Sequence, residues 1–154
     1  MNAVLREGVC SDVSALAEID AAASPNPWSA TQFDFQAERV LLIESDRRQV
    51  AFVVFAHVLD EGSIRNIAVH PDCQRQGLAR QLLSAALQYL SASGALCCLL
   101  EVRCSNLKAL ALYKSSGFQV DATRKNYYPA ATGREDAILM SKKPCDPNPS
   151  GAFV

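Results

Sequence analysis

The chain has 154 residues, of which 49% are hydrophobic and 20% are charged. A chain of this length buries enough surface to fold as one domain without disulfides or structural metal. Its 15 basic and 16 acidic side chains give a net charge of −1, which argues against bulk attraction to nucleic acid. No apolar run approaches the ~20 residues that span a bilayer, and residues 1–20 lack the pattern of a secretory signal. We expect a soluble cytoplasmic protein with one domain over residues 1–143 and no direct contact with membrane or nucleic acid.

Six cysteines are present, at positions 10, 73, 97, 98, 104 and 145. No CxxC pair with matching histidine spacing accompanies them, so we expect no metal site. In a reducing cytosol most of them should be small buried side chains, with one or two exposed thiols. Cys104 has no histidine nearby in sequence, and we do not assign it as a nucleophile. The segment from Pro144 is rich in proline and carries no pattern, which predicts disorder over residues 144–154.

Hydrophobic periodicity and turn residues predict an alternation of strands and helices. In chain order we predict a strand over 5–10, a helix from Ser11 or Asp12 to about Ala23, a helix capped by Ser29 that carries Phe33, Phe35 and Ala37, strands over 40–44, 50–59 and 64–69, a helix over 78–90 stopped by Gly94, a strand over 95–102, a helix over 106–116, and closing strands over 118–120 and 137–140 joined by a long polar loop. This order predicts a mixed α/β sheet with helices on both faces.

The most informative segment is IAVHPDCQRQGLARQLL, residues 67–83, where a strand-like run ends at a proline and an amphipathic helix begins. Gly77 allows the backbone to approach a ligand without interference from a Cβ atom. The free N–H groups and the positive dipole end of the new helix favour a phosphate. Arg75 and Arg80 flank this loop. The segment therefore predicts a phosphate-bearing cofactor, although a glycine at a helix start is also typical of a plain tight turn.

Three polar residues near the next strand and helix are candidates for chemistry. Glu101 follows an apolar run, where a carboxylate is costly to bury unless it is paired, reaches water or is used. It is either a general base or a strand-end residue that pairs with Arg103. Tyr113 is either a core residue or a proton donor, since a phenol of pKa about 10 can protonate a thiolate of parent pKa about 8.5. Asn106 caps its helix, contacts a ligand, or does both.

Four separated blocks carry a resemblance to a known family. They are PWS at 27–29, NIAVHPDCQRQGLAR at 66–80, LEVRCSN at 100–106 with ALYKSSGF at 111–118, and NYYP at 126–129 with GREDAILM at 133–140. Together they resemble the bacterial ribosomal-protein-alanine N-acetyltransferases, the RimI group of the GCN5-related N-acetyltransferase (GNAT) superfamily, over about residues 2–142. Cys104 stands where that family usually has a small residue such as alanine.

The resemblance implies the GNAT fold and acetyl-CoA as cosubstrate, with no metal. It implies direct acetyl transfer in a ternary complex to the N-terminal alanine α-amine of the eighteenth small-subunit ribosomal protein. Glu101 falls on the family's general base and Tyr113 on its general acid. The cofactor-binding residues that it implies are Ile67, Ala68 and Val69 for the pantetheine, Arg75, Gln76, Gly77, Leu78, Ala79 and Arg80 for the pyrophosphate, and Asn106 for CoA.

The sequence defines the binding site of the acetyl acceptor less well than that of the cofactor. Acidic and aromatic residues in its expected walls are Trp28, Phe33, Asp34, Tyr127, Tyr128, Glu135 and Asp136, for most of which packing or loop structure is the alternative reading. An acetyltransferase of the same fold that acts on a small amine or on many protein N-termini would have the same cofactor site. A catalytically silent acyl-CoA-binding module that regulates a partner is the non-enzymatic alternative.

Overall fold

The structure, a computed structural model, describes residues 2–143, so the predicted disordered tail and Cys145 lie outside the described residues. In chain order the elements are β1 Ala3–Glu7, η1 Cys10–Asp12, α1 Val13–Ala23, η2 Ala30–Gln32, β2 Arg39–Ser45, β3 Arg48–Val58, β4 Glu61–Val69, η3 Pro71–Cys73, α2 Leu78–Ala92, β5 Cys97–Arg103, α3 Leu107–Ser115, β6 Gln119–Pro129 and β7 Arg134–Lys142, where η denotes a short 3₁₀ turn.

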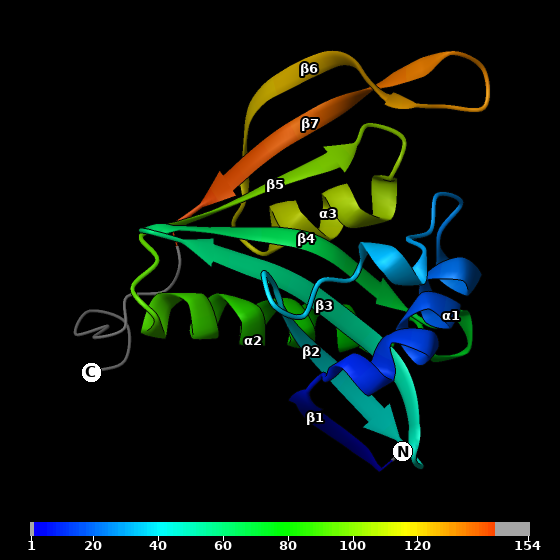
Figure 1. Cartoon of the computed structure of the whole chain (residues 1–154). Coiled ribbons are helices and arrows are strands. Elements are labelled where there is room, and N and C mark those ends of the chain that lie inside the picture. The colour runs from blue at the N-terminus through cyan, green and yellow to red at the C-terminus, as the bar shows by residue number, and fades with distance from the viewer. Residues whose placement is uncertain (1, 144–154) are drawn as a thin grey trace.

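The strands form one mixed seven-stranded sheet in the order β1-β2-β3-β4-β5-β7-β6, which confirms the predicted α/β class. Only β4 and β5 are parallel, and their pairing covers only residues 61–63 with residues 97–99. Beyond Ser63 the two strands diverge, so β5, β7 and β6 lean away from β1–β4 while the two groups stay joined at one end (Figure 1). The divergence opens the middle of the sheet.

Helices cover both faces of the sheet, as predicted. On one face α1 packs in an apolar cluster with Phe52 and Val54 of β3. On the other face α2 packs in a second cluster with Val53 and Phe55, the alternate residues of the same strand. This alternation follows from the twofold side-chain period of a strand. Tyr113 of α3 belongs to the cluster of α2.

A bulge in β4 decides which of its residues face α1. Val54 of β3 pairs with Asn66, whereas the next residue, Phe55, pairs with Ile64, so Arg65 is the extra residue. The insertion shifts the alternation by one position. Asn66 therefore turns toward α1, where its amide donates a hydrogen bond to Asp20.

The long helix α2 forms where the sequence predicts it. Its apolar residues Leu82, Leu83, Ala86 and Leu90 are all at most 1% exposed, so the helical period is satisfied by burial against the sheet. Gly94 follows the helix with φ of +100°, the left-handed conformation that commonly ends helices. The predicted stop is confirmed.

Two predictions near the N-terminus are wrong in detail. The first strand ends at Glu7 rather than Cys10, and the helix expected from Ser29 is only the turn η2. Downstream of η2 the side chain of Asp34 accepts hydrogen bonds from the backbone N–H groups of Gln36 and Ala37, at 3.0 and 3.2 Å. These local bonds offer the backbone an alternative to a helix, and the chain turns into β2.

The long polar loop predicted between the closing strands is also wrong. Most of it forms the hairpin of β6 and β7, which is joined by a short turn at residues 130–133. Its register is irregular between Arg124 and Tyr128, where Asn126 has φ of +51°. Because β6 is the sheet edge and most of its residues are exposed, it lacks the apolar alternation from which a strand is predicted.

The five described cysteines are free. Cys10 and Cys104 are exposed, Cys73 and Cys97 are half-buried, and Cys98 is buried. Burial raises the pKa of the Cys98 thiol to about 12, so this thiol stays protonated at neutral pH. The expectation of one or two exposed thiols is confirmed for this part of the chain, whereas the expectation that most of the cysteines are buried is wrong, because only Cys98 of the five is buried.

Candidate active site

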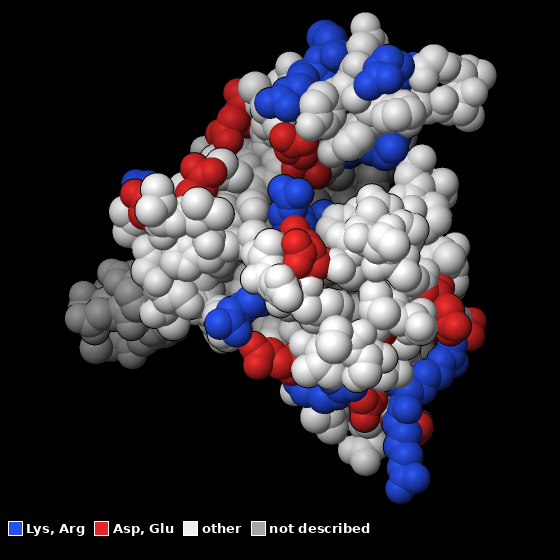
Figure 2. All heavy atoms as spheres, in the orientation of Figure 1, with Lys and Arg blue, Asp and Glu red and all other residues white. Residues whose placement is uncertain are grey.

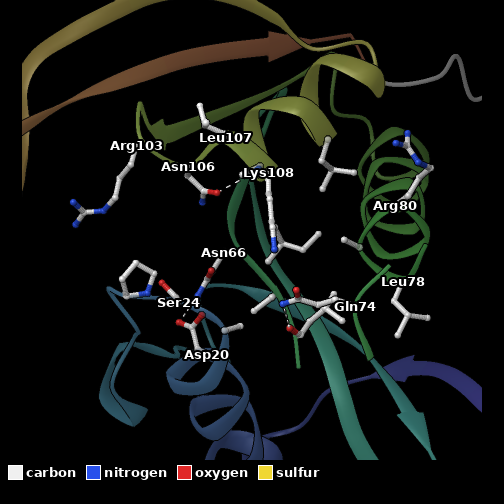
Figure 3. Close-up of a pocket in the computed structure, with 18 of the residues that line it drawn as sticks. Asp20, Ser24, Asn66, Gln74, Leu78, Arg80, Arg103, Asn106, Leu107 and Lys108 are labelled. Atoms are coloured by element: carbon white, nitrogen blue, oxygen red, sulfur yellow. Dashed lines mark hydrogen bonds between the residues drawn. The ribbon is translucent and has the colours of Figure 1, made fainter. Parts of the chain in front are cut away.

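A cavity of about 830 Å³ lies where β4 and β5 separate. Figure 2 shows the surface hollowed beneath the β6–β7 hairpin, and Figure 3 shows the side chains that enter the cavity from α1, β4, α2 and α3. Because α1 lies on one face of the sheet and α2 and α3 on the other, the cavity connects the two faces. A ligand in it can pass through the sheet between the two strands.

The α2 end of the cavity is built to receive an anion. Gly77 precedes α2 with φ of +80°, and a Cβ atom at this position would meet nothing within 4 Å. Arg75 is also left-handed, with φ of +64°. The first N–H groups of α2 therefore open toward the cavity at the positive end of the helix dipole.

Two side-chain hydrogen bonds hold this loop in place. Gln74 donates from Nε2 to the carbonyl of Val69 at 3.0 Å, which fastens the loop to the end of β4. Arg80 donates from Nη2 to Oγ of Ser115 at 2.8 Å, which ties α2 to α3. The loop is thus preorganised by contacts on both sides.

Most of the predicted cofactor-binding residues line this one cavity. They are Ile67, Ala68, Val69, Arg75, Gly77, Leu78, Ala79, Arg80 and Asn106. Gln76 is the one expected cofactor residue that is not among the residues lining the cavity. Since β4 pairs with β5 only as far as Ser63, the edge of residues 67–69 that faces β5 has no strand partner among residues 2–143. Such an edge can bind an extended ligand through its backbone.

Asn106 caps its helix and lies at the cavity wall. Its Oδ1 accepts a hydrogen bond from the backbone N–H of Ala109 at 3.2 Å, so it caps α3. Asn106 also lines the cavity, together with Lys108 and Leu112 of the same helix. The cap fixes the side chain at the cavity wall.

Sequence reasoning missed the polar wall contributed by α1. Asp20 is only 2% exposed, lines the cavity, and accepts hydrogen bonds from the Trp28 backbone N–H at 2.8 Å and from Asn66 Nδ2 at 3.0 Å (Figure 3). A polar residue in the apolar stripe of the predicted first helix was the available signal, since a buried carboxylate needs partners. Ser24, Pro25 and Asn26 continue this wall.

Glu101 is partly exposed and does not line the cavity. Its carboxylate lies 3.7 Å from Nη1 of Arg124 and has a side-chain exposure of 37%. The alternative pairing with Arg103 is wrong, because Arg103 donates instead to Glu135 at 3.0 Å and to the carbonyl of Pro129 at 2.7 Å. Arg103, two residues along the same strand face, does line the cavity. Glu101 therefore lies beside the cavity on that face of β5.

Tyr113 lies on the other face of the sheet. Its ring is 6% exposed and packs edge-to-face against Phe118 with centroids 5.7 Å apart. Burial raises the pKa of its phenol well above the usual value, and the nearby Cys98 and Tyr128 contribute in the same direction. The prediction that Tyr113 is a core residue is therefore confirmed for its ring. Glu101 and Tyr113 lie on opposite faces of the sheet, and neither is among the residues that line the cavity.

The β6–β7 hairpin is tied to the cavity through Arg103. The guanidinium of Arg103 lies over the ring of Tyr128 at 4.5 Å in addition to its bonds to Pro129 and Glu135. Hydrogen bonds from Ser105 and Arg103 lower the pKa of the Glu135 carboxyl below its usual value. These contacts hold the hairpin beside the β5 side of the cavity.

Other expected acceptor-wall residues serve packing and turns. Phe33 is 8% exposed and lies edge-to-face between Trp28 and Phe52, at 5.1 and 5.5 Å between centroids. Asp136 accepts hydrogen bonds from the backbone N–H of Asn126 and, with a smaller effect, from Lys125, and these bonds lower the pKa of its carboxyl.

Comparison with known proteins assigns the chain to a class. Residues 13–118 match the acetyltransferase (GNAT) family, and the chain belongs to this family. Within residues 2–143, no group of histidine, cysteine and acidic side chains is arranged to hold a metal ion. No helix in the same range is long and apolar enough to cross a bilayer.

Individual proteins and solved structures are also similar to this chain. The chain is 46% identical to the ribosomal protein bS18-alanine N-acetyltransferase of Salmonella typhimurium, over 84% of this chain and 90% of that protein. It is 44% identical to the enzyme of the same name from Escherichia coli K12, with the same coverage. The crystal structure of the ribosomal-protein-S18-alanine N-acetyltransferase from Escherichia coli superposes with a TM-score of 0.86 at 38% identity, over 92% of this chain and 94% of that chain. Ard1 from Thermoplasma volcanium shares the fold, with a TM-score of 0.81 at 22% identity over 93% and 98% of the two chains.

Proposed function

We propose that the protein transfers an acetyl group from acetyl-CoA to the N-terminal alanine α-amine of ribosomal protein bS18, as a single domain over residues 1–143 in the cytoplasm. The observation that supports this most is the 46% identity to the Salmonella enzyme across 84% of the chain. The cavity between β4 and β5 is consistent with it, because it offers an anion site at one end and an open strand edge along its side.

The residues present fit acetyl-CoA. The open cradle at Gly77 and the cations of Arg75 and Arg80 suit its phosphates. The free edge of residues 67–69 suits an extended pantetheine arm with amide groups, and Asn106 adds a side-chain amide at the same cavity. When bound, the cosubstrate supplies an activated acetyl thioester.

Glu101 and Tyr113 are suited to two different proton transfers. Glu101, on the α1 face of β5, would take a proton from the acceptor ammonium, directly or through water. Tyr113, on the α3 face, would donate its phenolic proton to the departing sulfur. Because the cavity connects the two faces, the base and the acid would act from opposite sides of the sheet.

The environment of Tyr113 sets a condition on this role. Burial raises the pKa of its phenol, so the hydroxyl stays protonated across the physiological range and is available as a donor. The same shift makes it a weaker acid, so donation requires a strongly basic acceptor. A thiolate of parent pKa about 8.5 is a weaker base than the phenolate of Tyr113, so the transfer is uphill from this resting structure and requires that ligand binding lower the pKa of the phenol.

An N-terminal amine suits a modest base better than a lysine does. An α-amine of pKa about 7.7 to 8.0 is roughly a tenth neutral at pH 7, whereas a lysine of pKa about 10.4 is far less so. Glu101 is partly exposed and pairs at 3.7 Å with Arg124 in an open part of the hairpin face, where a peptide terminus can reach it.

Incubation with acetyl-CoA and a panel of acceptors tests the proposal. The panel holds the N-terminal peptide of bS18, the same peptide with a blocked α-amine, lysine peptides and polyamines. We expect turnover on the free bS18 terminus and none on the blocked peptide. Equal turnover on polyamines or on unrelated termini would favour a broader acetyltransferase. Binding of CoA without turnover on any amine would favour a silent acyl-CoA-binding module.

A further inference from the structure

Lys108 enters the cavity from the first turn of α3, on the side that faces the loop before α2 (Figure 3). It is the second residue of the helix, directly after the cap residue Asn106 and Leu107. Lys108 lies between the segments LEVRCSN and ALYKSSGF and belongs to neither. Its side chain is exposed to the cavity rather than packed in the core.

The position of Lys108 is unfavourable for the stability of the protein alone. A cation in the first turn of a helix opposes the helix dipole, whereas Lys114 in the last turn of the same helix complements it. Lys108 takes part in none of the ion pairs found among residues 2–143. Its charge is therefore not explained by a contact within the described chain.

The neighbouring charges in the cavity have the same sign. Arg75 and Arg80 line it together with Lys108, as does Arg103, whose charge is already paired with Glu135. The one acidic residue that lines it within residues 2–143 is Asp20, which is already hydrogen-bonded to Trp28 and Asn66 on the α1 wall. Like charges gathered around one cavity repel each other unless an anion with several charges is bound there.

We propose that Lys108 binds a phosphate group of the acetyl donor from the α3 side of the cavity, opposite the loop at Gly77. The α2 loop would hold the donor through backbone N–H groups, and Lys108 would close the site from the other wall with a point charge. This inference rests on the proposed use of acetyl-CoA. The donor carries a diphosphate and a 3′-phosphate, and the experiment separates them.

Equilibrium titration of purified variants tests the inference without any acceptor. The probes are CoA, 3′-dephospho-CoA and pantetheine, which lacks phosphate. The variants are Lys108→Ala, Lys108→Glu and the control Lys114→Ala, which removes a lysine from the exposed far end of the same helix. Far-UV circular dichroism and thermal melting establish that each variant is folded.

We expect Lys108→Ala to weaken CoA binding by about twofold to fivefold, the upper part of the range of a single partly exposed ion pair. Lys108→Glu should weaken it further, the losses should shrink as salt is added, and Lys114→Ala should bind as the wild type does. Pantetheine should bind all variants equally. A loss that persists with 3′-dephospho-CoA identifies the diphosphate, and a loss that disappears identifies the 3′-phosphate.

Unchanged CoA affinity in both Lys108 variants, or an equal loss with pantetheine, would overturn the inference while leaving the cofactor site in place. If the wild-type protein bound no CoA at all, the proposed function would fail, and this inference would fail with it. The two failures are therefore distinguishable in one set of titrations.

Discussion

Replacing Asp12 by asparagine should remove a pH-dependent part of the stability of the N-terminal region. Asp12 is 5% exposed, and its carboxylate accepts hydrogen bonds from Arg6 at 2.9 and 3.0 Å, from Val9 N–H at 2.8 Å and from Gln49 at 2.9 Å. These bonds, above all those from Arg6, lower the pKa of Asp12 from 3.8 to about 2. At 1.36 kcal/mol per pKa unit, the shift corresponds to about 2 kcal/mol of folding free energy.

The direction of the pH dependence of stability follows from the lowered pKa of Asp12. The stabilisation is fully present above the unfolded-state pKa of 3.8 and is lost as the pH falls toward about 2. Urea unfolding at a series of pH values measures it as the difference between wild type and Asp12→Asn. We expect a difference of about 2 kcal/mol near neutral pH that decreases through this acidic window. The exposed Asp121→Asn is the control. A difference between wild type and Asp12→Asn that is independent of pH would refute the reasoning.

Three further predictions concern the site. Gly77→Asp should raise the Kd for acetyl-CoA by about tenfold or more, because it adds a negative charge to the anion site. The control Gly133→Asp, at another left-handed glycine in open space, should leave the Kd for acetyl-CoA unchanged. Equal affinity of the two variants for acetyl-CoA would show that this loop is not part of the site. Glu101→Gln should lower turnover by ~10²-fold, most strongly at low pH where more amine is protonated, and a flat pH profile at full activity would exclude it as the base. Tyr113→Phe should keep the affinity for acetyl-CoA and lower the single-turnover rate by ~10²- to 10⁴-fold. The control Tyr89→Phe should keep both the affinity and the rate. A wild-type rate in Tyr113→Phe would exclude Tyr113 as the required acid.

The elements that could be predicted are those whose pattern is local. The period of α2, the stop at Gly94 and the loop at Gly77 were predicted correctly because each follows from residue types close together in the sequence. The β6–β7 hairpin was not, since an exposed edge strand carries no apolar alternation and depends on pairing with β7.

The site could be predicted only where it follows a continuous segment. The loop of residues 75–80 and the strand of residues 67–69 are close in sequence, and all of their residues except Gln76 line the cavity. The cavity gathers side chains from distant segments, namely Asp20, Asn66 and Arg103. They reach it only because of the bulge at Arg65 and the divergence of β4 from β5. These are properties of strand pairing, which no local pattern specifies.

The acceptor that we propose for this protein is the α-amine of an N-terminal alanine. Its most direct measurement is site-resolved tandem mass spectrometry of bS18, with its initiator methionine removed, after incubation with the protein and acetyl-CoA. We expect a single acetyl group on the α-amine of the N-terminal alanine, with no lysine modified. Acetylation spread over lysines, or an unmodified N-terminus under conditions in which acetyl-CoA binds, would contradict the account.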